Sequence, residues 1–222
     1  MTIDTLINKQ DTSEIVRDQI AAILASETVA QQALATAAAE DPENWRFKVY
    51  LERSQPFNDW LNADLETLDP APLVNVSIDN YSCSERMGDP VTRQQSEAIF
   101  NIDCYGLGRA RTNGVGHIAG DKDAALECQR IVRLVRNILM SANYIHLGLK
   151  GTVGKRWVTG VEFYDVPQEQ RTVQQVMAAR VRLMVTYNEF GPQHTPTTLE
   201  YLAVDILDGG QVLIEADYDY TD

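Results

Sequence analysis

The residues that could do chemistry in this chain gather first in a glycine-rich stretch, YGLGRARTNGVGHIAGDKDAA, at positions 105–125. Such stretches between a strand and a helix often hold phosphate groups, because backbone N–H groups and the helix N-terminus face the anion. Gly106 and Gly108 match the first two positions of the dinucleotide-binding pattern GxGxxG, but Arg111 stands at the third. At the start of the following helix, Asp121 would repel a phosphate. The stretch therefore argues against a nucleotide site, and we expect no cofactor.

Histidine and cysteine residues lack the spacing of a catalytic or metal-binding site. His117, His146 and His194 lie in three separate segments, and the chain contains no H-x-H or H-x-x-x-H pattern. Cys104 and Cys128 fall at apolar positions of predicted elements, as small core residues do. Neither a CxxC pair nor a GxSxG motif occurs, so no zinc knuckle, disulfide framework or serine nucleophile is indicated. We predict no catalytic residue, no bound metal and a reducing compartment.

The composition of the 222 residues is that of a soluble protein, with 44% hydrophobic and 23% charged residues. No apolar run approaches the roughly 20 residues that span a bilayer. The first residues, MTIDTLINKQDTSE, do not resemble a secretory signal. The net charge of −13 disfavours tight binding to nucleic acid. We therefore expect neither a membrane protein nor a nucleic-acid-binding protein.

The charges are distributed unevenly along the chain. Residues 106–156 contain nine basic and three acidic residues, whereas residues 199–222 contain seven acidic residues and no Lys or Arg. One interpretation is a solvated surface with chance clustering. The other is that copies of the chain meet head to tail, because opposite charges on two different surfaces favour that pairing. The candidate assembly contacts are then Arg109, Arg111, Arg130 and Arg133 on the basic side and Asp217 and Asp219 on the acidic side.

Apolar periodicity predicts the elements before the glycine-rich stretch. Asp11 and Glu14 have capping-box spacing and precede a helical pattern. An alanine-rich segment either continues this helix or starts a second one, and DPEN at 41–44 ends it. Alternation of apolar and polar residues predicts strands over 45–51, 73–81 and 96–105, the last two as antiparallel neighbours. A loop or short helix around PFNDWLNADLETL separates the first strand from the second.

The elements after the glycine-rich stretch are predicted in the same way. A long helix is expected over 122–143, with Asp121 as its N-cap. Strands are expected over 155–166 and 174–190, and a hairpin is expected around the DGG turn. The apolar stripe of the long helix comprises Ala124, Cys128, Ile131, Val132, Val135, Ile138 and Leu139. The glycine-rich segment before this helix is left as a loop of about 15 residues, a length that is unusual unless it has a use.

The order of these elements predicts an α+β fold. A mostly antiparallel sheet would carry the long helix and an N-terminal helix on one face, and a C-terminal β-hairpin would follow. We expect one domain over residues 1–222, with an N-terminal helical region at 1–44 and the hairpin at 199–222.

Four segments together resemble a family of bacteriophage and prophage structural proteins: PLVNVSIDNY, FNIDCYGLGRA, LVRNILMSANYIHLGLKG and YNEFGPQHTPTTLEYL. The family is that of the tail terminator, or tail completion, proteins of long-tailed phages. The resemblance spans residues 45–205 and leaves out the N-terminal helix and the acidic hairpin after residue 208. It implies helices packed on a sheet and assembly as a ring, usually of six copies, with no catalytic motif.

The resemblance implies a virion protein rather than an enzyme. Its ring would cap the tail tube and join it to the head connector, so its partners would be copies of itself, the tail tube protein and the neck proteins. Assembly would take place in the host cytoplasm, and DNA would only pass through a channel whose negative wall does not hold it. Arg109 and Arg111 would bind carboxylates of a partner, and the glycines between 106 and 120 would give an assembly loop its freedom.

Three other functions fit the same residues. The chain could be another neck, head-completion or minor tail protein. It could be a small α+β enzyme with an active site between subunits and His117 or His146 as a base. It could also be an adaptor that binds a peptide at the edge of its sheet.

Overall fold

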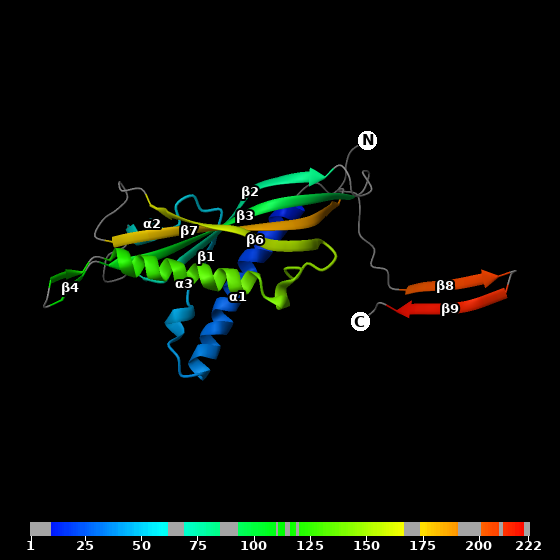
Figure 1. Ribbon diagram of the computed structural model, residues 1–222, viewed down its shortest axis with the longest axis horizontal. Coiled ribbons are helices and arrows are strands. Elements are labelled where there is room, and N and C mark those ends of the chain that lie inside the picture. Colours follow the sequence, from blue (N-terminus) through cyan, green and yellow to red (C-terminus); the bar gives the residue numbers. More distant parts are fainter. Residues whose placement is uncertain are drawn as a thin grey trace.

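Five strands form one mixed sheet in the order β1-β2-β3-β7-β6, and two long helices cover one of its faces (Figure 1). The computed structural model describes residues 10–61, 69–84, 93–109, 111–113, 116–118, 120–166, 174–190, 201–208 and 211–219. The sheet consists of β1 (Lys48–Leu51), β2 (Leu73–Ser84), β3 (Arg93–Arg109), β6 (Val153–Asp165) and β7 (Gln174–Phe190). The helices are α1 (Thr12–Ala37) and α3 (Asp121–Leu139). All neighbouring strands of the sheet except β1 and β2 are antiparallel, so the predicted α+β class is confirmed.

Helix α1 begins at the predicted capping box. The Asp11 N–H donates to the Glu14 carboxylate over 2.9 Å, and the Asp11 carboxylate accepts from the backbone of Glu14. The alanine-rich segment continues the same helix to Ala37, since alanine has the highest helix propensity. The residues that α1 buries against the sheet include Val16, Ile20, Ile23 and Leu24.

Strand β1 is shorter than predicted. Trp45, expected at its start, belongs to a 3-10 turn, η1 (Pro42–Trp45), and the strand begins only at Lys48. β1 runs parallel to β2, and a parallel pair needs a crossover connection. That connection contains a short helix, α2 (Asn58–Leu61), as the sequence allowed. A second hydrophobic cluster forms around it and includes Phe57, Trp60, Leu73, Tyr105 and Leu107.

Strand β3 alternates as predicted and separates the two hydrophobic clusters. Tyr105 and Leu107 belong to the second cluster, so they face away from the helices, because successive side chains of a strand point to opposite faces. β2 is the antiparallel neighbour of β3, as expected. The fully buried residues of β3 on the helix side are Ala98, Phe100, Ile102 and Cys104.

The prediction of a loop of about 15 residues before the long helix is wrong. β3 continues through Arg109, and Gly106 and Gly108 pair with β7. Helix α3 begins at Asp121 with Gly120 as its N-cap, so Asp121 is the first helical residue rather than the cap. Between β3 and α3 lie two short strands that pair with each other, β4 (Arg111–Asn113) and β5 (Gly116–Ile118).

Helix α3 buries the predicted stripe. It ends at Leu139, four residues earlier than expected, and a 3-10 turn, η2 (Ala142–Tyr144), follows. α3 packs mainly on β3 and β7, whereas α1 reaches β1 and β2. Val76 and Ile78 therefore lie on a strand that α1 covers. The buried residues of α3 are Ala124, Cys128, Ile131, Val132, Leu134, Val135, Ile138 and Leu139.

Strand β7 pairs with β3 along its whole length and with β6 on its other side, so β6 forms one edge of the sheet. The strands predicted over 155–166 and 174–190 are thereby confirmed. The hairpin predicted around DGG is confirmed as well, as β8 (Tyr201–Asp208) and β9 (Gln211–Asp219). These two strands form a separate sheet, which lies beyond the end of the main sheet in Figure 1.

Candidate assembly surfaces

The first two glycines of the glycine-rich stretch form a contact between a strand and a helix rather than a turn around a ligand. A Cβ at Gly106 would lie 2.3 Å from the Ala124 carbonyl oxygen. A Cβ at Gly108 would lie 1.8 Å from the Gly120 carbonyl oxygen. Both distances are far below van der Waals contact, so these glycines let α3 lie close against β3. The expectation that they give a loop its freedom is wrong.

The buried cysteines belong to the core, as predicted. The Cys128 thiol donates to the Cys104 carbonyl oxygen over 3.5 Å, and burial raises the pKa of Cys128 to about 12. A thiol that stays neutral is a poor nucleophile. The His146 ring nitrogen Nδ1 lies 2.8 Å from the Val153 carbonyl oxygen. Within the described residues, no group of three or more His, Cys, Asp or Glu side chains is placed to hold a metal ion.

Four hollows on the described surface are open to solvent. Their volumes lie between about 440 and 780 Å³, and no histidine lines any of these four. An enzyme that uses His117 or His146 as a base would need a deep polar pocket around one of them. The backbone of His117 lies in β5, and its side chain and the whole of His194 lie outside the described residues.

An ion pair joins the two central strands on the face opposite the helices. Arg180 of β7 stands directly across from Asp103 of β3 and donates from Nε to Oδ1 over 2.7 Å and from Nη2 to Oδ2 over 2.9 Å. Asp103 is buried, and 34% of the Arg180 side chain is exposed. Tyr164 interacts with Asp103 and Tyr105, and burial raises its pKa to about 12. Because the two forked bonds fix the pairing of β3 with β7, the pair has a structural role.

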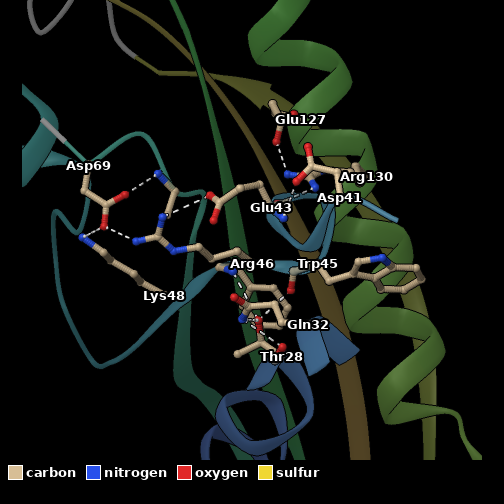
Figure 2. A network of polar contacts seen from close by, with 12 residues as sticks. Thr28, Gln32, Asp41, Glu43, Trp45, Arg46, Lys48, Asp69, Glu127 and Arg130 are labelled. Carbon is tan, nitrogen blue, oxygen red and sulfur yellow. Dashed lines mark hydrogen bonds and ion pairs between the residues drawn. The ribbon is translucent and has the colours of Figure 1, made fainter. Parts of the chain in front are cut away.

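Arg130, a predicted assembly contact, is engaged inside its own subunit (Figure 2). Its Nη1 donates to the Glu43 carbonyl oxygen over 3.1 Å, and its Nη2 is bonded to the Glu127 carboxylate one helical turn away. Only 15% of its side chain is exposed. These bonds tie α3 to the η1 turn, and an assembly contact through Arg130 would have to share the same guanidinium.

The same polar network continues toward β1 and α1 (Figure 2). Arg46 donates to the Asp69 carboxylate over 2.7 Å, and the Lys48 ammonium lies 2.9 Å from the same oxygen. Thr28 of α1 donates its hydroxyl to the Trp45 carbonyl oxygen over 2.7 Å. Because these bonds join α1, the η1 turn, β1 and the segment before β2, they hold the crossover in place.

An exposed apolar group lies along the edge strand β6 and at the end of α3. Val161 and Phe163 of β6 are 37% and 52% exposed, and Met140, just after α3, is 43% exposed. A hollow of about 440 Å³ lies between the helix end and the strand, and Arg136 lines it. Sequence reasoning missed these residues. The alternation of apolar residues predicts that Val161 and Phe163 face the helices and are buried. Their exposure follows from the strand order, which places β6 at the edge of the sheet.

The remaining predicted contacts lie in separate elements. Arg133 is exposed on α3. Arg109 ends β3 and Arg111 begins β4, while Asp217 and Asp219 belong to β9. The backbone of these four residues is described, and their side chains lie outside the described residues. In Figure 1 the hairpin that contains β9 lies away from α3, so one subunit keeps the acidic hairpin apart from Arg130 and Arg133 of the helix.

No protein-family model matches the chain, and no curated protein matches it. In the part of the chain that the structure describes, the helices are too short or too polar to cross a membrane. The function has to be inferred from the surfaces of the chain itself.

Proposed function

We propose that this chain is a non-enzymatic subunit of a ring that closes the tail of a long-tailed phage, a tail terminator. The observation that carries the proposal is the division of charge between two elements that lie apart. Residues 106–156, from the end of β3 to the start of β6, contain nine Lys or Arg and three acidic residues. Residues 199–222 contain seven acidic residues and no Lys or Arg. Two unlike surfaces on one chain favour a heterologous contact, which closes into a ring when the rotation between subunits permits it.

The polar groups of the described residues support a structural role over catalysis. Asp103 and Arg180 bond to each other, and Arg130 bonds to Glu127 and to the η1 turn. Cys128 is held neutral by burial at ordinary pH. Groups that are engaged in this way hold elements together and offer little to a substrate.

The resemblance of four segments to tail terminator proteins supports a particular place for the ring. It would cap the tail tube and join it to the head connector, so the tail tube protein and the neck proteins would be its partners in the virion. The net charge of −13 suits a channel through which DNA passes without sticking.

Native mass spectrometry of the full-length protein tests the ring. Six copies are expected of a terminator, twelve would indicate a connector, and a monomer at micromolar concentration would contradict the proposal. Electron microscopy of purified tail tubes mixed with the protein tests the place of the ring. Density at one end of the tubes is expected, and tubes that remain bare would refute the terminator role.

A further inference from the structure

The edge strand β6 is open to a further strand over part of its length. Among the described strands it pairs only with β7. Its six residues from Gly160 to Asp165 pair with β7 without interruption, whereas register shifts occur at Val153/Lys155 and at Val158/Gly160. A regular sheet edge presents backbone N–H and C=O groups to any strand that comes alongside.

The two faces of this edge differ in chemistry. Val161 and Phe163 stand opposite Val181 and Ala179 of β7, which are buried beneath the helices, so the helix side of the edge is apolar up to Asp165, which stands opposite Met177. The opposite side is charged. It includes Lys155, Glu162 and Arg182, all exposed, with Arg182 Nη2 3.3 Å from the Glu162 carboxylate.

The β8–β9 hairpin divides its residues between two faces in the same way. Directly opposed residues of an antiparallel pair share a face. The register places Leu202–Tyr218, Val204–Ala216 and Ile206–Ile214 on one face and Tyr201–Asp219, Ala203–Asp217 and Asp205–Glu215 on the other. One face of the register is therefore apolar, and the other carries four carboxylates.

A hairpin of two strands is marginal in water when it stands alone. β8 and β9 form a sheet of their own, and Figure 1 places it beyond the end of the main sheet, away from α1 and α3. An apolar face of this kind needs a surface to pack on, and an acidic face is best placed beside basic residues.

We infer that the β8–β9 hairpin of one subunit docks on the β6 edge of a second copy and extends its sheet by two strands. The apolar face of the hairpin continues the helix side of the sheet, beside Val161 and Phe163. The acidic face continues the side with Lys155 and Arg182. Each subunit gives a hairpin on one side and receives one on the other.

Charge favours a second copy of this chain as the occupant of the edge. The hairpin segment, residues 199–222, carries seven acidic residues and no base, whereas residues 150–165, which lead into and form β6, carry three bases and two acids. Because every copy of the chain carries both segments, the complementary partner is present at the concentration of the protein itself. The inference rests on the proposed ring. In a ring contact, the surface that donates the hairpin has to differ from the surface that receives it.

Two full-length double variants test the contact. Val161→Asp with Phe163→Asp charges the edge and leaves the hairpin intact, and Val204→Asp with Ile214→Asp charges the hairpin and leaves the edge intact. Each variant alone is expected to be monomeric by light scattering, with a dissociation constant raised about 30-fold or more, which corresponds to about 2 kcal/mol. Mixed in equal amounts, the two are expected to form a heterodimer and nothing larger. The control Val29→Asp, on an exposed position of α1, is expected to form wild-type rings.

The outcomes separate the hairpin contact from the ring. A hairpin variant that still forms rings overturns the contact and leaves the ring standing, and a wild-type protein that is monomeric overturns both. A mixture that stays monomeric, from variants with the wild-type circular dichroism spectrum, also overturns the contact. Where a variant loses that spectrum, hydrogen exchange of the wild-type protein decides. The amides from Gly160 to Asp165 should exchange at least about tenfold more slowly in the ring than in the dilute monomer, and equal rates overturn the contact.

Discussion

Gly106→Ala is the substitution that probes most directly how the glycine-rich stretch works. The new methyl group would lie 2.3 Å from the Ala124 carbonyl oxygen and 2.5 Å from the Cys128 backbone nitrogen. Both atoms belong to the main chain of α3, so no side chain can rotate away to make room. The helix would have to move from 2.3 Å to the 3.4 Å of an ordinary contact, a shift of about 1.1 Å.

The magnitude follows from how the helix is held. α3 is buried along its inner face against β3 and β7, so a shift of its first turns strains or opens contacts of the main core. One extra methyl group in a packed core usually costs about 1–3 kcal/mol. Because rigid main chain opposes it here, we expect the upper end, about 3 kcal/mol. Replacing glycine also lowers the conformational entropy of the unfolded chain, which stabilises the folded state by less than about 1 kcal/mol.

Urea unfolding followed by circular dichroism measures this free energy of unfolding, with the m-value unchanged if both states keep their compactness. Gly160→Ala is the matched control, since Gly160 also lies in a strand, and a Cβ there would have no atom within 4 Å. Its effect should stay within about 1 kcal/mol in either direction. If Gly106→Ala lowers the free energy of unfolding no more than this control does, the glycine is not required for the close approach of α3 to β3.

Three further results are expected from the core, the ion pair and the buried thiol. Ile131→Ala should lower the free energy of unfolding by about 2–5 kcal/mol, and Leu126→Ala on the exposed face of α3 by less than about 0.5 kcal/mol; similar losses would mean that the faces of α3 are assigned wrongly. Asp103→Asn should cost about 1–3 kcal/mol, and a double-mutant cycle with Arg180→Met should show a coupling energy, whereas additive losses would contradict the bond. The pKa of Cys128 rises from its ordinary value of 9.0 to about 12 on folding because the thiol is buried. The unfolded chain therefore loses this proton first, and stability should fall as the pH rises from 9 toward 12, less steeply in Cys128→Ala; identical slopes would refute this source of the pH dependence.

The elements that depend on local pattern could be predicted from the sequence. The capping box at Asp11 located α1 to within a residue, and alternation located β3, because both signals come from neighbours in the chain. The apolar stripe of α3 identified its buried face for the same reason. Trp45 was misplaced in a strand because its alternation with Phe47 continues into the 3-10 turn that precedes β1.

Features that depend on distant partners could not be predicted. Gly106 and Gly108 have the composition of a turn, and only their pairing with β7 and their contact with α3 make them part of a strand. The bond of Arg130 to the Glu43 carbonyl joins residues 87 positions apart. Val161 is exposed because β6 has a neighbour on one side only among the described strands, and strand order is not contained in the alternation of any single strand.

The pairing of β3 with β7 also has a consequence for the folding rate. The nearest paired residues, Arg109 and Gln174, are 65 positions apart, and the farthest, Arg93 and Phe190, are 97 apart. Closing a loop of this length costs about 4 kcal/mol of chain entropy before any contact offsets it. Until β7 pairs with it, β3 lacks one of its two strand neighbours, and α3 lacks one of the two strands on which it mainly packs. Refolding should therefore be slow for a chain of this size, and its barrier should respond more to substitutions in β3 and β7 than to those in α1.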